Sequence, residues 1–189
     1  MRTFLSIPIP DELKNKIAEF QNKIKPLGKI KLVEKENIHL TLKFLGDVRE
    51  NKIPGIIENL KIISENKDNK KFKIKLCGAG AFPNMNYIKI LWIGVSESYG
   101  SDEVLSLHEQ VDEQLTLLKF KKDNKFHPHA TIARIKFLNT KDKKELKDML
   151  CENLKTDFGD FEVPGFELMK SELTTRGSIY FSLKQFEFV

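Results

Sequence analysis

The four-residue pattern His-x-Thr-x occurs twice in the sequence and joins two residue types that can act together on a phosphate ester. The first copy holds His39 and Thr41, and the second, about half the chain length later, holds His129 and Thr131. Because the unperturbed pKa of histidine is about 6.5, one imidazole can be neutral and another protonated near neutral pH. A threonine hydroxyl can donate a hydrogen bond to a phosphate oxygen. Two such pairs predict acid–base chemistry on a phosphate.

The alternation of side chains along a β-strand would place each histidine and its threonine on one face of the strand. The residues that follow each of them are apolar and can anchor the opposite face in a core. If two such strands face one cleft, the site holds two imidazoles and two hydroxyls. This set suits the opening of a cyclic phosphate by water, since one imidazole can activate the water and the other can protonate the departing ribose oxygen. The hydroxyls can stabilise charge on the phosphate, and the reaction requires no metal.

Two basic residues follow the motifs and are candidates for phosphate binding. Strict alternation continues the face of His39 to Lys43, which predicts either a phosphate contact or an exposed strand lysine. The same alternation puts Arg134 on the face opposite His129, unless a β-bulge interrupts the strand. His127 shares the face of His129 and is expected at the rim of the cleft.

The spacing of apolar residues predicts the elements that must position these side chains. Apolar residues three and four positions apart mark helices near 11–28, 53–63, 102–118 and 146–150. Asp11 is expected to cap the first of these helices, and His108 to be a structural residue beside the apolar stripe of the third. Runs rich in β-branched and aromatic residues predict strands at 2–9, 38–45, 72–82, 88–95, 129–135, 158–173 and 179–188.

These predicted helices and strands interleave, yet some strands also follow one another in hairpin-like pairs. The order favours an α+β fold with antiparallel or mixed sheets flanked by helices. A single echo of His-x-Thr-x at half the chain length suggests two related lobes, whereas a repeat array would have a shorter period. No Gly/Ser-rich or Pro-rich linker divides the chain, so we expect residues 1–189 to form one two-lobed domain.

Composition limits the classes of protein to which the chain can belong. The sequence has 32 Lys and Arg against 27 Asp and Glu, and the net charge of +5 favours a polyanionic partner without identifying it. No apolar run approaches the ~18 residues of a membrane span, and the N-terminus lacks the pattern of a secretory signal. The 2 cysteines form no CxxC pair and suggest no disulfide framework, so the cytoplasm is the expected compartment.

The residues around both motifs resemble those of a known family. The segments Asn37–Gly46 and His127–Arg134 resemble the paired HxTx motifs of the 2H phosphoesterases, and in particular of the RNA 2′,3′-cyclic phosphodiesterases, also called 2′-5′ RNA ligases. The resemblance covers nearly the whole chain and includes Arg2–Ile7, Gly80–Pro83 and Leu91–Val95. One copy of so short a motif arises easily by chance, whereas two copies with matching flanks are a specific signal.

The resemblance implies a pseudo-twofold fold with a central cleft, and hydrolysis of RNA 2′,3′-cyclic phosphate ends to 2′-phosphates. It makes His39 the proton donor to the leaving 3′ oxygen and His129 the base that activates water, a choice that the residues alone leave open. It also implies that Arg134 helps to hold phosphate and that reverse 2′-5′ joining of RNA ends is a side activity. The expected partner is RNA with cyclic phosphate ends, such as tRNA fragments, bound by a monomer without a cofactor. Tyr180 and Arg176 are further candidates for the border of the cleft.

Two other classes of protein remain to be weighed against this enzyme. A non-catalytic protein that binds RNA ends would need basic and aromatic groups, but not two acid–base histidines. A histidine-based metal site would need further ligands, yet no second histidine at i+2 or i+4 after either motif histidine and no carboxylate between the pairs supports one. We therefore expect no metal at the site, and turnover measured with and without a chelator separates the three hypotheses.

Overall fold

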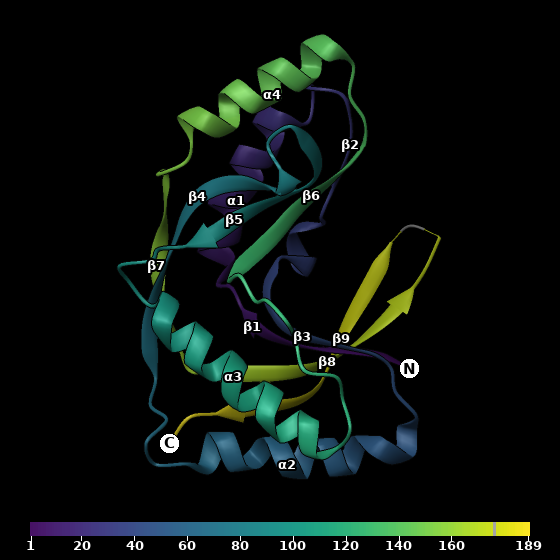
Figure 1. The fold of residues 1–189 in the computed structure, drawn as a ribbon, viewed down its shortest axis with the longest axis vertical. Coiled ribbons are helices and arrows are strands. Elements are labelled where there is room, and N and C mark those ends of the chain that lie inside the picture. The colour runs from purple at the N-terminus through teal and green to yellow at the C-terminus, as the bar shows by residue number, and fades with distance from the viewer. Residues whose placement is uncertain (176) are drawn as a thin grey trace.

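The computed structural model describes residues 1–175 and 177–189, and its fold is α+β, as the sequence predicted. In this part of the chain, Figure 1 shows helices above and below a long curved sheet. The helical elements are α1 (Asp11–Ile24), α2 (Ile53–Glu65), α3 (Ser101–Leu117), α4 (Thr140–Glu152) and the 3-10 turns η1 (Lys35–Asn37) and η2 (Glu50–Lys52). The strands are β1 (Arg2–Pro8), β2 (Lys29–Leu32), β3 (His39–Asp47), β4 (Phe72–Asn84), β5 (Tyr87–Val95), β6 (His129–Phe137), β7 (Asp157–Val163), β8 (Gly165–Leu173) and β9 (Ser178–Glu187).

The structure differs from the sequence prediction in one missed strand, one divided strand and one helix cap, each for a local reason. The strand Lys29–Leu32 was missed, because four residues are too short for its alternation to stand out. The strand predicted at 158–173 is two strands, since Pro164 cannot donate a ladder hydrogen bond and separates them. Asp11 does not cap the first helix, because Pro10 holds that position. Asp11 instead lies in the first turn, where a carboxylate interacts favourably with the helix dipole.

Among the described residues, the nine strands form one sheet whose order is β7-β4-β5-β6-β3-β1-β8-β9, with β2 paired to β6. Neighbouring strands are antiparallel throughout. The two motif strands, β3 and β6, meet through one residue pair, Leu40 opposite Ala130. Reading outward from this junction, each half of the sheet begins with a motif strand and continues through three more. The order therefore has the pseudo-twofold character that the family resemblance implied.

Each motif strand carries a β-bulge directly after its threonine. Two successive residues of β1 lie opposite Thr41 and Lys43 on β3, so Leu42 is the extra residue of the bulge. The strand β6 has the same irregularity against β5, with Ile132 as its extra residue. A bulge leaves one residue unpaired and shifts the alternation of the residues that follow it. The side chains beyond each bulge consequently exchange faces relative to an uninterrupted strand.

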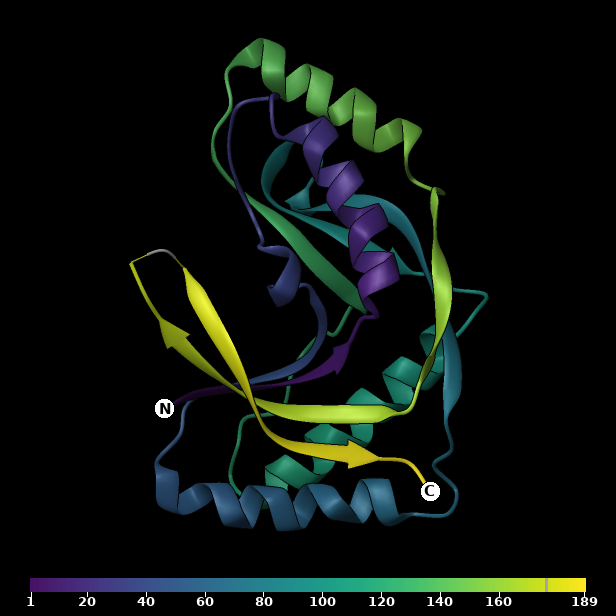
Figure 2. The same cartoon turned by 180° about the vertical axis from the view of Figure 1, so that it is seen from behind.

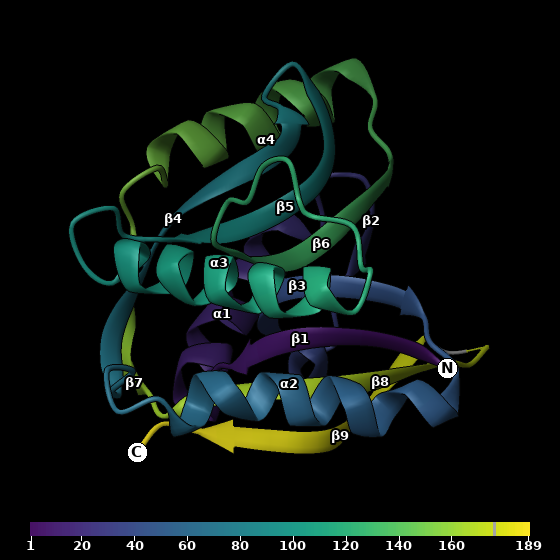
Figure 3. The same cartoon turned by 60° about the horizontal axis from the view of Figure 1, so that its bottom comes forward.

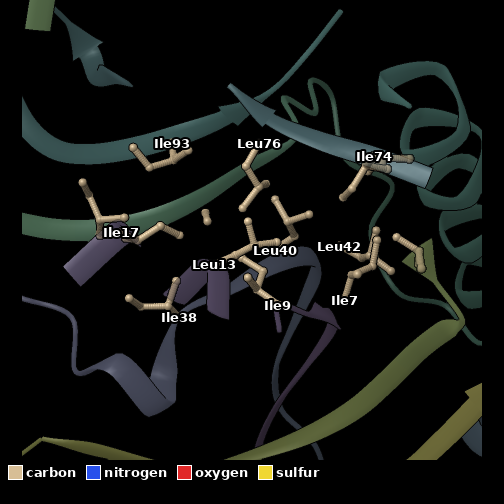
Figure 4. Close-up of a cluster of buried hydrophobic side chains, with 14 of the residues drawn as sticks. Ile7, Ile9, Leu13, Ile17, Ile38, Leu40, Leu42, Ile74, Leu76 and Ile93 are labelled. Atoms are coloured by element: carbon tan, nitrogen blue, oxygen red, sulfur yellow. The ribbon is translucent and has the colours of Figure 1, made fainter. Parts of the chain in front are cut away.

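The apolar residues of the two motifs lie in the hydrophobic core, on the face opposite the histidines. Leu40, Leu42, Ala130 and Ile132 are each at most 1% exposed. In Figure 4 the side chains labelled on β1, α1, β3, β4 and β5 point toward one another, so both halves of the sheet contribute to one core. Burial of a large aliphatic side chain is worth roughly 1.5–3 kcal/mol. The core therefore fixes the two motif strands relative to each other.

The helices cover the outer surfaces of the two halves. Figure 2 shows α1 and α4 packed on the half that contains β4 to β7, whereas α2 lies below β8 and β9 at the other end. In Figure 3, α3 runs beside α2 and in front of β3, and the green segment after it returns to the start of β6. In the described part of the chain, no helix combines the length and the apolar character needed to cross a membrane.

Candidate active site

The two motif histidines are the first residues of the two strands that meet at the centre of the sheet. His39 begins β3 and His129 begins β6. Because Leu40 lies opposite Ala130 in antiparallel register, the histidines stand on either side of this pair. The histidine and the threonine of each motif have partly buried side chains, whereas the apolar residues that follow them are fully buried. The fold thus brings the two copies of the motif together, as the sequence predicted.

His39 is fixed by two hydrogen bonds and by two aromatic rings. Its Nδ1 lies 2.7 Å from the carbonyl oxygen of Asn37, and its Nε2 lies 2.9 Å from Oγ1 of Thr41. A carbonyl oxygen only accepts, so Nδ1 donates, and in the neutral ring Nε2 then accepts from the threonine hydroxyl. The ring of Phe4 stacks on the imidazole at 4.9 Å, and that of Tyr180 meets it edge-on at 5.4 Å. The ring is held with one defined tautomer.

His129 is held in a closely similar way in the other half of the sheet. Its Nδ1 donates to the carbonyl oxygen of His127 at 2.6 Å, again two residues earlier in the chain. The rings of Phe82 and Trp92 meet the imidazole edge-on, at 4.9 and 6.3 Å between ring centroids. Within the described residues, neither Nε2 of His129 nor the hydroxyl of Thr131 has a hydrogen-bond partner in the protein. Both groups can therefore bind a substrate phosphate or a water.

Both imidazoles favour the neutral form in the free protein. Burial is the main cause that lowers the pKa of His39 to about 4. The hydrogen bond to the Asn37 carbonyl opposes this change, and the positive charges of Lys14 and of a protonated His129 add to it. Burial also lowers the pKa of His129, although the His127 carbonyl opposes the change. The lowered pKa of His39 thus depends in small part on the charge state of His129.

A cavity of about 670 Å³ opens over the junction of the two motif strands. Thr41 of the first motif and His129 of the second line it, with Phe44, Phe82 and Lys125 around them. His39 and Thr131 are not among the residues that line it, but the side chain of His39 is hydrogen-bonded to that of Thr41, which does line it. A larger cavity of about 1060 Å³ adjoins it, yet none of the four motif side chains lines that cavity. The smaller cavity is the candidate active site.

Lys43 does not lie where strict alternation placed it. The bulge at Leu42 turns Lys43 to the face opposite His39, where it is 3% exposed. Its Nζ forms ion pairs with Asp112 and, at 3.2 Å, with Asp123. Strict alternation therefore misplaced Lys43 on its strand, and the alternative of an exposed strand lysine is wrong, yet Lys43 still lines the cavity together with Thr41 and His129. Its charge is already engaged by two carboxylates in the free protein.

Arg134 lies on the face of the strand that carries His129. The extra residue Ile132 interrupts the alternation, which is the condition under which the sequence allowed Arg134 to reach the site. Its side chain is exposed, and it occupies the position in β6 that Phe44 occupies in β3. Phe44 is 70% exposed. The two halves thus present an arginine and an aromatic ring at equivalent places.

Other aromatic residues of the site were missed, or only partly identified, in the sequence. Phe4, Phe82 and Trp92 form walls around the histidines, but an aromatic residue in a strand predicts core packing equally well. Gly80 lies against the indole ring of Trp92, and a Cβ atom there would collide with the ring. Tyr180 does border His39, as its position suggested. The other candidate for the cleft border, Arg176, lies outside the described residues.

The remaining histidines have supporting positions. His127 lines the cavity with an exposed side chain, in agreement with its expected place at the rim. His108 is 7% exposed and donates from Nδ1 to the carbonyl oxygen of Leu42 at 2.9 Å, which agrees with a structural role. In residues 1–175 and 177–189, no group of three or more His, Cys, Asp or Glu side chains is arranged to hold a metal ion.

Comparison with known proteins gives relatives along the whole chain. A family model described as the AKAP7 2′5′ RNA ligase-like domain matches residues 2–188. An RNA 2′,3′-cyclic phosphodiesterase of Methanocaldococcus jannaschii is 44% identical over 185 residues, which cover 98% of this chain and 99% of the relative. A protein with the same name from Archaeoglobus fulgidus is 36% identical over 187 residues, covering 99% and 100%.

Solved structures share the fold. A crystal structure of a Thermus thermophilus protein superposes with a TM-score of 0.82 at 26% identity and covers 100% of this chain and 98% of that one. E. coli LigT complexed with 3′-AMP gives a TM-score of 0.76 at 21% identity, covering 99% and 97%, and bears on the fold alone. The family model spans nearly the whole chain, and full-length relatives exceed 30% identity. The chain belongs to the 2′5′ RNA ligase-like domain family.

Proposed function

We propose that this protein hydrolyses RNA 2′,3′-cyclic phosphate ends to 2′-phosphomonoesters. The observation that carries the proposal is the pairing of β3 with β6 at Leu40 and Ala130, which sets two similarly held imidazoles on either side of one junction. The family supports the substrate class, because relatives that align over the full length are named RNA 2′,3′-cyclic phosphodiesterases. We infer that both halves of the sheet work as one catalytic domain, since each contributes one histidine.

The hydrogen bonds of the histidines support the proposed acid–base roles. Each Nδ1 donates to a backbone carbonyl, which leaves Nε2 as the atom that gains or loses a proton. His129 has an unengaged Nε2 and is the proposed base, which takes a proton from water as the water attacks phosphorus. His39, protonated once the anionic phosphate is bound, gives a proton to the departing 3′ oxygen. The phosphate then remains on the 2′ oxygen, and the product is a 2′-phosphomonoester.

Two hydroxyls and one guanidinium are proposed to bind the phosphate. Thr41 and Thr131 occupy the same place in the two motifs, and their hydroxyls can donate to non-bridging oxygens, where charge gathers in the transition state. Thr41 can do so once His39 is protonated, because Nε2 of His39 then no longer accepts its hydroxyl proton. Arg134 can add a charge-assisted hydrogen bond from the face that it shares with His129. Lys43, by contrast, is held by Asp112 and Asp123, so we do not include it among the phosphate ligands.

The remaining features of the protein are proposed on coarser grounds. Phe44 and Phe82 border the cavity and offer faces on which a nucleobase can stack, and Lys125 offers a positive charge for the RNA backbone. The substrates would include tRNA fragments with cyclic ends. The same site can catalyse reverse 2′-5′ joining, because a catalyst accelerates both directions of a reaction. We propose that the protein works as a monomer, and in the cytoplasm, where its free cysteines would stay reduced.

The proposal is tested by incubating the protein with a short RNA that ends in a 2′,3′-cyclic phosphate, with and without excess chelator. We expect equal rates in both conditions and a 2′-phosphate product, identified by ³¹P NMR. A rate that collapses in chelator and returns with one added ion would move the protein to the metal-dependent phosphodiesterases. Tight binding of the RNA without any turnover would support the non-catalytic binder. A 3′-phosphate product would keep the two-histidine chemistry but reverse the orientation of the substrate.

A further inference from the structure

The segment that leads into the second motif depends on side chains for its position. Residues 118–128 connect α3 to β6 and contain no helix or strand. Four residues of this segment line the candidate active site: Asp123, Lys125, Phe126 and His127. The carbonyl oxygen of His127 is also the group that accepts the Nδ1–H of His129. Any displacement of this segment would therefore move both a wall of the site and the partner of a catalytic histidine.

A buried lysine from the first motif strand holds this segment. Nζ of Lys43 donates to the carbonyl oxygen of Lys121 at 2.9 Å and pairs with Asp123 at 3.2 Å. The same Nζ donates to Asp112 of α3, whose other carboxylate oxygen accepts from the backbone N–H of Asp123 at 3.0 Å. Two carboxylates and one carbonyl thus surround one ammonium. The cluster ties β3, α3 and the connecting segment together.

His108 adds a second attachment at the same place. Its Nδ1–H donates to the carbonyl of Leu42, the extra residue of the first bulge, and its ring stacks on Phe126 at 3.8 Å with an interplanar angle of 10°. Its Nε2 lies 4.0 Å from the Asp123 carboxylate. The bulge in β3 therefore supplies both anchors. It presents the Leu42 carbonyl to His108 of α3 and directs the Lys43 ammonium to Asp112, although Lys43 also lines the cavity.

The charges of the cluster favour its closed form. Asp112 is 2% exposed, and burial by itself would raise the pKa of its carboxyl. The hydrogen bonds from Lys43 and from the Asp123 N–H outweigh burial and hold that pKa below its ordinary value, so the carboxylate stays charged at neutral pH. A buried ion that loses its partner is strongly unfavourable. Release of the connecting segment would expose or unpair these charges, which opposes its opening.

We propose that Lys43, Asp112 and Asp123 form a positioning cluster that fixes the connecting segment, and through the His127 carbonyl fixes His129, relative to the first motif. The inference rests on the proposed function, because it assigns the second motif a catalytic role. It gives Lys43 a task other than phosphate binding. It also explains why a charged residue stands on the buried face of a strand that is otherwise apolar there. The two halves of the site would thus be linked through charges as well as through the sheet.

The first test is Asp123→Ala, because Asp123 is partly exposed and its loss should leave the protein folded. Misplacement of a catalytic group by about 1 Å can cost about 10²-fold in rate, so we expect kcat to fall about 10–100-fold while KM changes less than about threefold. Asp123→Glu should restore most of the rate. Asp157→Ala is the matched control, since it removes a carboxylate paired with Lys75 at 3.0 Å outside the site, and it should leave kcat unchanged.

A second test needs no substrate. The connecting segment contains Lys119, Lys121, Lys122 and Lys125, so its opening can be measured as the rate of tryptic cleavage there. Asp123→Ala should raise this rate relative to wild type and to Asp157→Ala. An unchanged cleavage rate, or an unchanged kcat in a protein whose segment has opened, would overturn the inference. Failure of the wild-type protein to open cyclic phosphates would instead overturn the proposed function, whatever the cleavage rates.

The double variant Lys43→Met/Asp112→Leu removes both buried charges together. Replacement of a buried ion pair by apolar residues is often tolerated, so this variant should fold where Lys43→Met alone leaves carboxylates unpaired. We expect a lower kcat, a nearly unchanged KM and faster tryptic cleavage of the segment. A raised KM and weaker inhibition by inorganic phosphate, with the segment still resistant to trypsin, would show that Lys43 binds the phosphate directly and would refute the positioning role.

Discussion

At the scale of single residues, the two histidines are held by the same kind of local contacts. In each, Nδ1 donates to the carbonyl oxygen two residues earlier, and aromatic rings shield the imidazole from water. The carbonyl fixes the tautomer, and the shielding favours the neutral form. The surroundings of Nε2 differ, because His39 accepts from Thr41 whereas His129 is unengaged within the described residues. This difference supports unequal roles for two motifs that the sequence alone could not distinguish.

The lowered pKa values predict the pH dependence of catalysis. A base must be neutral and an acid protonated, so kcat/KM should follow a bell between the two pKa values of the free enzyme. Burial lowers the pKa of His39 to about 4 and lowers that of His129 as well, so the bell should peak below pH 6.5. A bound phosphate anion raises the pKa of a nearby imidazole. The alkaline limb of kcat should therefore lie at higher pH than that of kcat/KM.

The check is a pair of profiles, kcat and kcat/KM, measured from pH 4 to pH 9 on a cyclic phosphate substrate. Loss of the alkaline limb in His39→Ala, with the acid limb retained, would identify His39 as the acid. A kcat/KM maximum at or above pH 7.5 would contradict the lowered pKa values. A flat profile, with chemistry shown to limit the rate, would remove the acid–base pair from the mechanism.

The same pKa predicts how stability changes with pH. In the unfolded chain His39 would bind a proton near pH 6.5, whereas in the folded protein it does so only near pH 4. Between these values the unfolded state binds more protons, so the free energy of unfolding should fall as pH decreases from 6.5 toward 4. We expect the melting temperature of His39→Gln to fall less over this interval than that of wild type. Parallel curves for the two proteins would exclude this contribution.

At the scale of elements, the bulges decide which side chains meet the substrate. The alternation of apolar and polar residues placed His39, Thr41, His129 and Thr131 correctly on one face of their strands. It failed for Lys43, because a bulge depends on how a strand pairs with its neighbour, and the residues of one strand do not reveal this. The helices were predicted well from the local pattern of apolar residues, because a helix contains its own hydrogen-bond partners and does not depend on a neighbouring strand.

Aromatic neighbours of the histidines were hard to predict for a related reason. Phe4 and Tyr180 lie at opposite ends of the sequence and meet His39 only because β1 pairs with both β3 and β8, and β8 in turn pairs with β9, which carries Tyr180. The short β2 likewise pairs with β6, which is distant from it in sequence. The motif, by contrast, is compact. The chemistry of the candidate site could be predicted from four residues, whereas its walls required the strand order.

The position of Arg134 after its bulge leads to a prediction for binding. A hydrogen bond to a charged group is worth roughly 1.5–3 kcal/mol, so Arg134→Met should raise KM for the cyclic phosphate about 10–100-fold if the guanidinium binds it. Lys136→Met is the matched control, because it removes an exposed cation two residues further along β6. Steady-state kinetics of both variants provide the check. If both variants raise KM by the same small factor, Arg134 contributes only to the general positive charge of the surface and does not bind the phosphate.

At the scale of the whole molecule, two halves of similar strand order meet at one residue pair and share one core. Each half supplies one histidine and one threonine, and the bulge in β3 ties the segment before His129 to α3. The pseudo-twofold arrangement accounts for the repeated motif. The differences between the halves, such as Phe44 in one and Arg134 in the other, make the site asymmetric. A nucleotide has a base at one end and a phosphate at the other, so its binding in one orientation requires an asymmetric site.

The claim that the two histidines form one acid–base pair is tested most directly by single-turnover kinetics on RNA with a 2′,3′-cyclic phosphate end. The proteins to compare are wild type, His39→Ala, His129→Ala and the double variant. Each single change should lower the rate about 10²–10⁴-fold in a protein with an unchanged melting profile. Because residues that act as a unit have non-additive effects, the double variant should be little slower than the worse single variant. A single variant with near-normal turnover, or a double variant whose loss is the product of the two single losses, would contradict the claim that the two histidines form one acid–base pair.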